Sequence, residues 1–225
     1  MFTMLIYCLM AGSTSCQQPL VAKAPVIEGD STIYLNINFM NRGYCYAYST
    51  QPKTQDPEFN GWADSDNIPV KITDPKIRKG ILQIIADTSK HVPYAGKFKG
   101  FRLSVCNTTG DTVLFKAQDS RLNLKLQAKN KEGEWADIEY LPSSTCGNSY
   151  HKLKLESGSQ WNFVIPDYRG SFKTRIRARL AVIDNTDPAK ESIIYSNEFN
   201  GSVNPGQFTD KKEYDRNGLM DPYEN

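Results

Sequence analysis

The stretch FKTRIRARL, residues 172–180, alternates two kinds of residue with a period of two. Every second position holds a cation, namely Lys173, Arg175, Arg177 and Arg179, and the positions between them carry no charge. Successive side chains of a β-strand point to opposite faces, whereas an α-helix repeats about every 3.6 residues. The stretch therefore predicts a half-buried β-strand with all four cations on one face.

The same alternation recurs in residues 33–39 and 122–129. No segment carries a helical apolar stripe over three turns. Turn residues such as Glu132-Gly133-Glu134 separate further runs that are typical of strands, at residues 81–86, 99–107, 111–117, 134–141, 160–165 and 191–199.

Many short strands with regular turns predict an all-β protein, and their number and spacing resemble an antiparallel immunoglobulin-like or fibronectin-type β-sandwich. We expect the sandwich over residues 31–208, either as one domain or as a sandwich over residues 99–208 to which residues 31–98 add N-terminal strands and loops. Residues 17–30 contain few order-forming residues and carry Pro19, Pro25 and Gly29, so they predict a tether. Residues 209–225 form an acidic C-terminal tail.

An apolar run over residues 1–11 precedes the small residues Gly12-Ser13-Thr14-Ser15-Cys16. A helix rises about 1.5 Å per residue, so this run is too short to cross a hydrocarbon core of about 30 Å and is typical of an export signal. Ser13-Thr14-Ser15-Cys16 resembles the lipobox of bacterial lipoproteins, in which the cysteine is acylated and becomes the new N-terminus. The resemblance implies that residues 1–16 are an export signal with lipidation at Cys16. It also implies an extracytoplasmic protein, lipid-anchored to the bacterial membrane or cell surface.

Two triplets, Asn107-Thr108-Thr109 and Asn200-Gly201-Ser202, fit the N-glycosylation acceptor pattern, and they leave a secreted eukaryotic protein as the alternative. The chain has 27 basic and 25 acidic residues and a net charge of +2, so no general affinity for nucleic acid is expected. The expected partners are the membrane, through the lipid anchor, and a glycan or protein ligand.

Three cysteines, Cys45, Cys106 and Cys146, follow the export signal. In an oxidising compartment they allow three alternative disulfides with one thiol left over, and we prefer Cys106–Cys146 because both residues flank strands of the predicted sandwich. The chain has two histidines and no Cys/His spacing typical of zinc. Cys146 lies near His151 in sequence, but this separation does not supply the geometry of a cysteine enzyme, so no catalytic residue is predicted.

The C-terminal tail spaces oxygen-bearing residues in the manner of an EF-hand calcium loop. Glu213 stands at the first position of this pattern, and Gly218 stands where the loop turns sharply. The resemblance implies a calcium site whose ligands are Asp215, Asn217, Leu219 through its carbonyl, Asp221 and Glu224. The alternative is a solvated acidic tail, and no other cofactor is expected.

The cations of residues 173–179 form a ladder about 20 Å long on the predicted strand. It has two interpretations. Pairing across strands would neutralise the ladder, and Asp137 and Glu139 are suitable partners. Alternatively, the ladder forms a patch for an anionic polymer, phosphate groups or an acidic protein, widened by Lys125, Lys129, Lys152 and Lys154.

Tyr44, Tyr46 and Tyr48 alternate with other residues, so we expect all three on one face of a strand. A strip of aromatic side chains with polar tips suits a sugar ring or a protein partner, and Phe59 and Trp62 would extend it. The alternative is packing in the core or between strands.

These features favour a lipid-anchored extracytoplasmic binding or adhesion module that presents one face of a β-sandwich to a glycan or protein. The alternative is an accessory or inhibitor protein that docks its loops against an envelope enzyme. A hydrolase is a second alternative, for which the sequence offers no paired catalytic groups.

Overall fold

The computed structural model describes residues 33–49, 67–141, 147–184, 186–187 and 189–209. The predicted all-β, antiparallel class is confirmed: these residues form fourteen strands and two short 3-10 turns, with no α-helix among them. Consequently, the described part of the chain contains no helix that is long and apolar enough to span a membrane.

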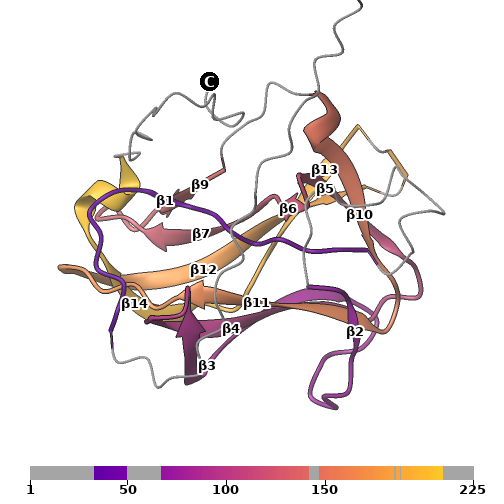
Figure 1. Ribbon diagram of the computed structural model, residues 1–225, viewed down its shortest axis with the longest axis horizontal. Coiled ribbons are helices and arrows are strands. Elements are labelled where there is room, and N and C mark those ends of the chain that lie inside the picture. Colours follow the sequence, from indigo (N-terminus) through magenta and orange to yellow (C-terminus); the bar gives the residue numbers. More distant parts are fainter. Residues whose placement is uncertain (1–32, 50–66, 142–146, 185, 188, 210–225) are drawn as a thin grey trace, which may run out of the picture.

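One layer of the sandwich is an antiparallel sheet that we call the β4 sheet (Figure 1). Its long hairpin turns at Ala95 and Gly96, which both adopt positive φ angles, and a bulge interrupts the pairing between Asp87 and Val92. In order across the sheet, its strands are β2 (Val70–Lys71), β11 (Ser159–Pro166), β4 (Phe98–Asn107) and β3 (Leu82–Tyr94).

A second sheet, the β12 sheet, contains the stretch from which the fold was predicted. Its central strand is long enough for two strands to pair in succession along the same edge. The strands are β8 (Trp135–Asp137), β7 (Leu124–Lys129), β12 (Phe172–Ile183), and then β13 (Glu191–Tyr195) and β14 (Phe199–Val203), which lie one after the other along the same edge of β12.

Two smaller sheets complete the architecture. One is antiparallel and consists of β10 (Tyr150–Leu155), β5 (Val113–Gln118) and β6 (Arg121–Leu122). The other is a parallel pair, β1 (Asn41–Arg42) and β9 (Glu139–Tyr140). In Figure 1 the strands β5, β6, β7 and β10 lie above the β4 sheet, and the two 3-10 turns are η2 (Gly147–Ser149) and η3 (Pro205–Phe208).

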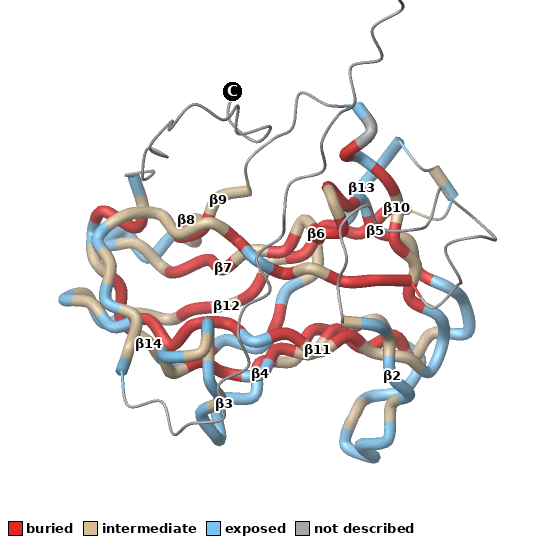
Figure 2. The backbone as a smooth tube through the Cα atoms, viewed as in Figure 1, coloured by how far each residue is buried: buried red, intermediate tan, exposed pale blue. Residues whose placement is uncertain are grey.

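A single hydrophobic core fills the space between the layers. Alternation along each strand supplies it, as on β4, where Leu103 and Val105 are fully buried, Ser104 between them is half-buried and Arg102 before them is exposed. Figure 2 shows the buried stretches running along the facing strands of both layers. The core cluster also includes Cys45 and Ala47, so the N-terminal segment packs into the same core as the later strands.

One N-terminal prediction is corrected by the structure. Residues 33–39 form no regular strand, only isolated parallel bridges from Ile33 to Phe98 and from Leu35 to Tyr168. Leu35 still packs against the core, because the alternation that suggested a strand does place it inward. The alternation alone could not supply a neighbouring strand edge with which this segment would pair continuously.

Buried polar groups attach this N-terminal segment to the rest of the fold. The Asn41 side chain donates a hydrogen bond from Nδ2 to the Tyr168 hydroxyl at 2.9 Å, and that hydroxyl donates to Oε1 of Glu139 at 2.9 Å. The other carboxylate oxygen of Glu139 accepts a hydrogen bond from the backbone N–H of Leu126 at 2.9 Å. Glu139 is only 5% exposed. Its carboxylate thus replaces a backbone acceptor at the point where the strand pair β7–β8 ends.

The position of Glu139 contradicts the prediction that it faces the cation ladder. The prediction continued one alternation from residue 134 to residue 141, but Ile138 falls between β8 and β9 and breaks it. Ile138 and Glu139 are consequently both buried. Burial raises the pKa of the Glu139 carboxyl from its ordinary 4.5 to about 7, despite the two hydrogen bonds that favour its charged form.

Candidate functional site

The outer face of the β12 sheet carries the predicted ladder. On β12 the residues Ile176, Ala178 and Leu180 are buried in the core, which leaves the alternating cations on the other face. Lys173 is exposed, and Arg175, Arg177 and Arg179 are half-buried. The strand geometry predicted from the sequence is therefore present. The contacts of each cation determine whether it is paired within the protein or can bind a ligand.

Arg177 is held tightly by its neighbours. Its Nε and Nη2 donate to Oε1 of Gln127 at 3.1 and 3.0 Å. Its guanidinium carbon lies 4.1 Å from the ring centre of Trp135 and 3.7 Å from that of Tyr195. Stacked and hydrogen-bonded in this way, the Arg177 side chain contributes to packing of the outer face.

Other charges on this face pair across strands. Asp137 forms an ion pair with Lys125 and accepts a hydrogen bond from Gln127. Arg175 lies 3.4 Å from a carboxylate oxygen of Glu198 and donates to Oδ1 of Asn200 at 2.9 Å. Cross-strand pairing, the alternative considered for the ladder, accounts for these residues.

Three cations of the face remain without a carboxylate partner in the part of the chain that the structure describes: Lys129, Lys173 and Arg179. Lys129 places its ammonium 5.3 Å from the Trp135 ring centre, a cation–π contact that leaves its charge uncompensated. Lys125 and Lys129 both lie on β7 beside β12, as the patch required. Lys152 and Lys154 lie instead on β10, in a different sheet, so they do not widen the ladder directly.

A groove with a volume of about 700 Å³ gathers two ladder cations with residues from the other layer. Residues of β12 and β14 line one side of it, and residues of the β3–β4 hairpin line another. Its lining residues are Thr88, His91, Phe101, Lys129, Asp167, Arg169, Lys173, Thr174, Arg175, Asn200, Gly201 and Ser202. Four of these carry a permanent positive charge and one carries a carboxylate.

The single carboxylate of the groove is already engaged. Oδ2 of Asp167 lies 2.9 Å from Nε2 of His91 and 3.4 Å from Nη2 of Arg169. The Asp167 side chain is 5% exposed, whereas that of His91 is 39% exposed. The His91 ring stacks on Phe101 at 5.0 Å, and Arg169 stacks over Tyr34 at 4.1 Å. The excess positive charge of the groove therefore faces solvent.

The four cations of the groove are groups that suit an anionic ligand. Guanidinium and ammonium groups bind carboxylate, sulfate and phosphate oxygens. The His91–Asp167 pair has the geometry of a base and its orienting group. The residues that contact His91 in the described chain are Asp167, Phe101 and Tyr34, and none of them is an activated nucleophile. Sequence analysis missed this pair because 76 positions separate the two residues and only the fold brings them together.

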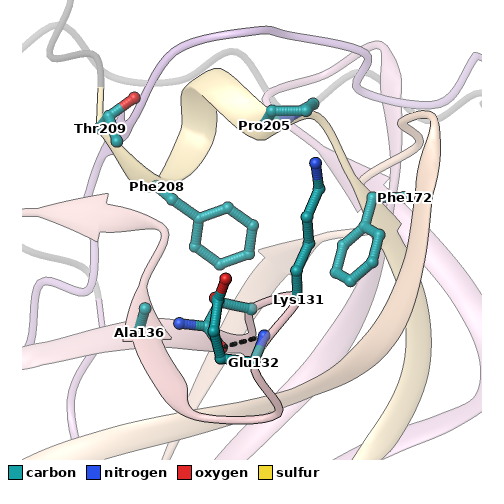
Figure 3. Close-up of a pocket in the computed structure, with 8 residues that line it drawn as sticks. Lys131, Glu132, Ala136, Phe172, Pro205, Phe208 and Thr209 are labelled. Atoms are coloured by element: carbon teal, nitrogen blue, oxygen red, sulfur yellow. Dashed lines mark hydrogen bonds between the residues drawn. The ribbon is translucent and has the colours of Figure 1, made fainter.

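An apolar cavity of about 350 Å³ lies beside η3 (Figure 3). The rings of Phe172 and Phe208 flank it, with centroids 6.5 Å apart in an edge-to-face arrangement. Lys131 and Glu132, from the turn between β7 and β8, line another side. The cavity is half the size of the groove and was not predicted from the sequence.

The three tyrosines do not form one aromatic face. Residues 43–49 are irregular apart from a single antiparallel bridge between Tyr46 and Arg121. Tyr44 is 52% exposed, whereas Tyr48 is 7% exposed. The Tyr48 carbonyl accepts a hydrogen bond from Nε1 of Trp161 at 2.8 Å, which ties the segment to the core. The predicted strand is corrected, and Phe59 and Trp62 lie outside the described residues.

The preferred Cys106–Cys146 disulfide stays a prediction, since only one of its two cysteines lies among the described residues. Cys45 and Cys106 are both buried, and they form no disulfide with each other. Cys106 faces the outer side of the β4 sheet, where its sulfur lies 3.5 Å from Oε1 of Gln160. Burial raises the pKa of Cys106 to about 11 and that of Cys45 further above its ordinary value. Cys146 lies outside the described residues.

His151, which follows Cys146 in sequence, is a buried strand residue. Its Nδ1 lies 3.2 Å from the Ser149 carbonyl, and burial lowers its pKa. Buried between strands in this way, His151 is placed as a packing residue. Among the described residues there is also no cluster of three His, Cys, Asp or Glu side chains that would hold a metal ion.

The predicted lipidation site, Cys16, and the calcium loop of Asp215, Asn217, Leu219, Asp221 and Glu224 lie outside the described residues. Both stay predictions. No protein-family model, no curated protein and no solved structure matches the chain.

Proposed function

We propose that this protein is a lipid-anchored extracytoplasmic binding module, and that its ligand, a glycan or a protein, occupies the groove on the β12 sheet. The observation that carries the proposal is the groove itself. Its volume of about 700 Å³ lies within the range of about 300 to 1,000 Å³ that is usual for ligand sites. Residues from five strands and one loop converge on it, including His91, Asp167 and Arg169 from the opposite layer.

The rigidity of its surroundings supports a binding role. Arg177 and its stacked neighbours Trp135 and Tyr195 fix the outer face beside the groove. Asp167 fixes both His91 and Arg169. A site held in place before the ligand arrives loses less conformational entropy on binding.

A lipid anchor at Cys16 would hold this module at a membrane surface. Two or more acyl chains give stable attachment, whereas one chain binds only reversibly. Labelled palmitate should enter the wild-type protein and not Cys16→Ser. Equal incorporation in both would refute the anchor. The proposal that the groove binds a ligand does not depend on this result and is tested separately.

The binding role is tested by filling the groove. Asn200 is exposed on its rim, so Asn200→Trp should block ligand entry without entering the core. Val164→Trp is the matched control, because Val164 is 40% exposed on the outer face of the β4 sheet. Glycan arrays and affinity capture from solubilised envelopes should give ligands that Asn200→Trp loses and Val164→Trp keeps. The proposal fails if wild type retains nothing above background or if both variants retain the same ligands.

A further inference from the structure

We propose that the groove recognises an acidic glycan, meaning a saccharide that carries carboxylate or sulfate groups. This inference rests on the proposed binding function and adds the chemical class of the ligand. The first observation is charge. Lys129, Arg169, Lys173 and Arg175 line one groove, against the single carboxylate of Asp167.

The two arginines of the groove lie near carboxylates, whereas its two lysines do not. Arg169 lies 3.4 Å from the Asp167 carboxylate through one Nη, which leaves its other donors for a ligand. Arg175 donates from Nε and Nη2 to Glu198 and from Nη1 to Asn200, so only its two remaining N–H groups are available. Lys129 and Lys173 form no ion pair within the described part of the chain. Two ammonium groups with no counter-charge set the sign of the potential in the groove and select an anionic ligand.

The spacing of the cations suits a ligand with repeated anionic groups. Lys173 and Arg175 are two positions apart on β12, which places their Cα atoms about 7 Å apart on the same face. On the β14 side, their cross-strand partners are Ser202 and Asn200. The cations therefore form a row, and neutral hydrogen-bonding residues lie beside each of them.

Neutral polar groups supply the second part of the recognition. Asn200 accepts a hydrogen bond from Arg175 at Oδ1, which leaves its amide NH₂ group directed to no residue of the described chain. Thr88, on the opposite wall, likewise forms no side-chain hydrogen bond with the described residues. A hydroxyl-rich ligand can bond with both groups, so the lining combines sites for anions with sites for sugar hydroxyls.

The aromatic content of the groove distinguishes a saccharide from a single-stranded nucleic acid. Proteins that bind single strands stack the bases on exposed aromatic rings. The rings that line this groove are Phe101, which is 7% exposed, and His91, which stacks upon it. The groove thus provides charge and hydrogen bonds with little surface for base stacking.

The test uses the purified full chain and one saccharide backbone in three forms: dextran oligosaccharide, its carboxymethyl derivative and its sulfate. Single-stranded oligonucleotide is a fourth probe. We expect calorimetric binding of at least one acidic form and none of neutral dextran. The double variant Lys129→Gln/Lys173→Gln should lower that affinity at least tenfold, and raising the ionic strength should weaken wild-type binding more than variant binding.

The matched control is Lys71→Gln/Lys79→Gln, which removes the same charge from exposed lysines of the β2 region. It should change the affinity less than twofold, and circular dichroism should show the same fold in both double variants. A preference for carboxymethyl dextran over dextran sulfate assigns carboxylate as the anionic group, and the reverse assigns sulfate.

Three results would overturn the ligand class: equal losses in both double variants, tighter binding of the oligonucleotide than of either acidic saccharide, or no binding of any acidic form. If a neutral glycan or a protein is still captured and then lost in Asn200→Trp, the binding function stands and only the ligand class fails. If that capture is absent as well, the proposed function fails with it.

Discussion

The buried carboxyl of Glu139 makes a quantitative prediction about stability. Burial raises its pKa from 4.5 to about 7, a difference of two to three pH units, and each unit corresponds to about 1.4 kcal/mol. The folded protein therefore binds a proton at Glu139 between these two pH values, and the unfolded chain does not. The stability that comes from this proton is fully present below pH 4.5 and is lost as the pH rises through 7, by about 3 kcal/mol in all.

Glu139→Gln removes this dependence because glutamine does not titrate and resembles the protonated acid. Its amide oxygen can still accept the hydrogen bond from the Leu126 N–H, and its amide NH₂ faces the Tyr168 hydroxyl. Relative to wild type, we expect the variant to gain about 3 kcal/mol of unfolding free energy between pH 4.5 and pH 8.

The assay is urea denaturation of both proteins at pH values from 4.5 to 8.5, with the linear extrapolation of the unfolding free energy. Glu156→Gln, which removes an exposed carboxyl at the turn after β10, corrects for the change in net charge. Groups other than Glu139 titrate alike in the proteins, so they cancel in the difference. A difference between wild type and Glu139→Gln that stays constant across this range would refute a carboxyl whose charged form is disfavoured by burial.

Further predictions concern packing, thiols and the tail. Arg177→Lys should cost about 2 kcal/mol of stability, because an ammonium cannot reproduce the two stacked rings and the forked hydrogen bond; an unchanged urea midpoint would contradict this. The thiols of Cys45 and Cys106 should react slowly with maleimide at pH 7 and rapidly in urea, since burial raises both pKa values; rapid labelling of folded protein would contradict the burial. Millimolar calcium should protect the peptide bonds at residues 211–212 from trypsin, and Glu224→Gln should abolish the protection; a cleavage rate that is the same with and without calcium would mean that the loop does not bind it.

Local alternation explains which parts of this fold were predictable. The β12 stretch, the β7 stretch and the runs around residues 99–107 and 160–165 form strands because the inward residues reach a core on their own face. The outward position of the ladder follows from the same pattern. Alternation predicts the buried side chains wrongly where the chain passes from one sheet to another, as at Ile138. The next strand pairs with a different partner there, so the positions that face the core change.

The groove required the tertiary fold. His91 and Asp167 lie 76 positions apart, and nothing in either local sequence marks them as neighbours. Sequence analysis did find Lys129, Lys173 and Arg175, since their charge and periodicity are local properties. It could not separate these cations from Arg177, because only the structure shows that Trp135, Tyr195 and Gln127 surround that guanidinium.

The groove as the binding site is tested most directly by an NMR titration of the ¹⁵N-labelled full chain with carboxymethyl dextran oligosaccharide. The account predicts that the largest shifts, saturating with ligand, fall on the backbone amides of Lys129, Lys173, Arg175 and Asn200. Amides of β10, which carries the lysines of a different sheet, should move little. Shifts confined to β10 or to the cavity beside η3, with the groove amides unmoved, would contradict it.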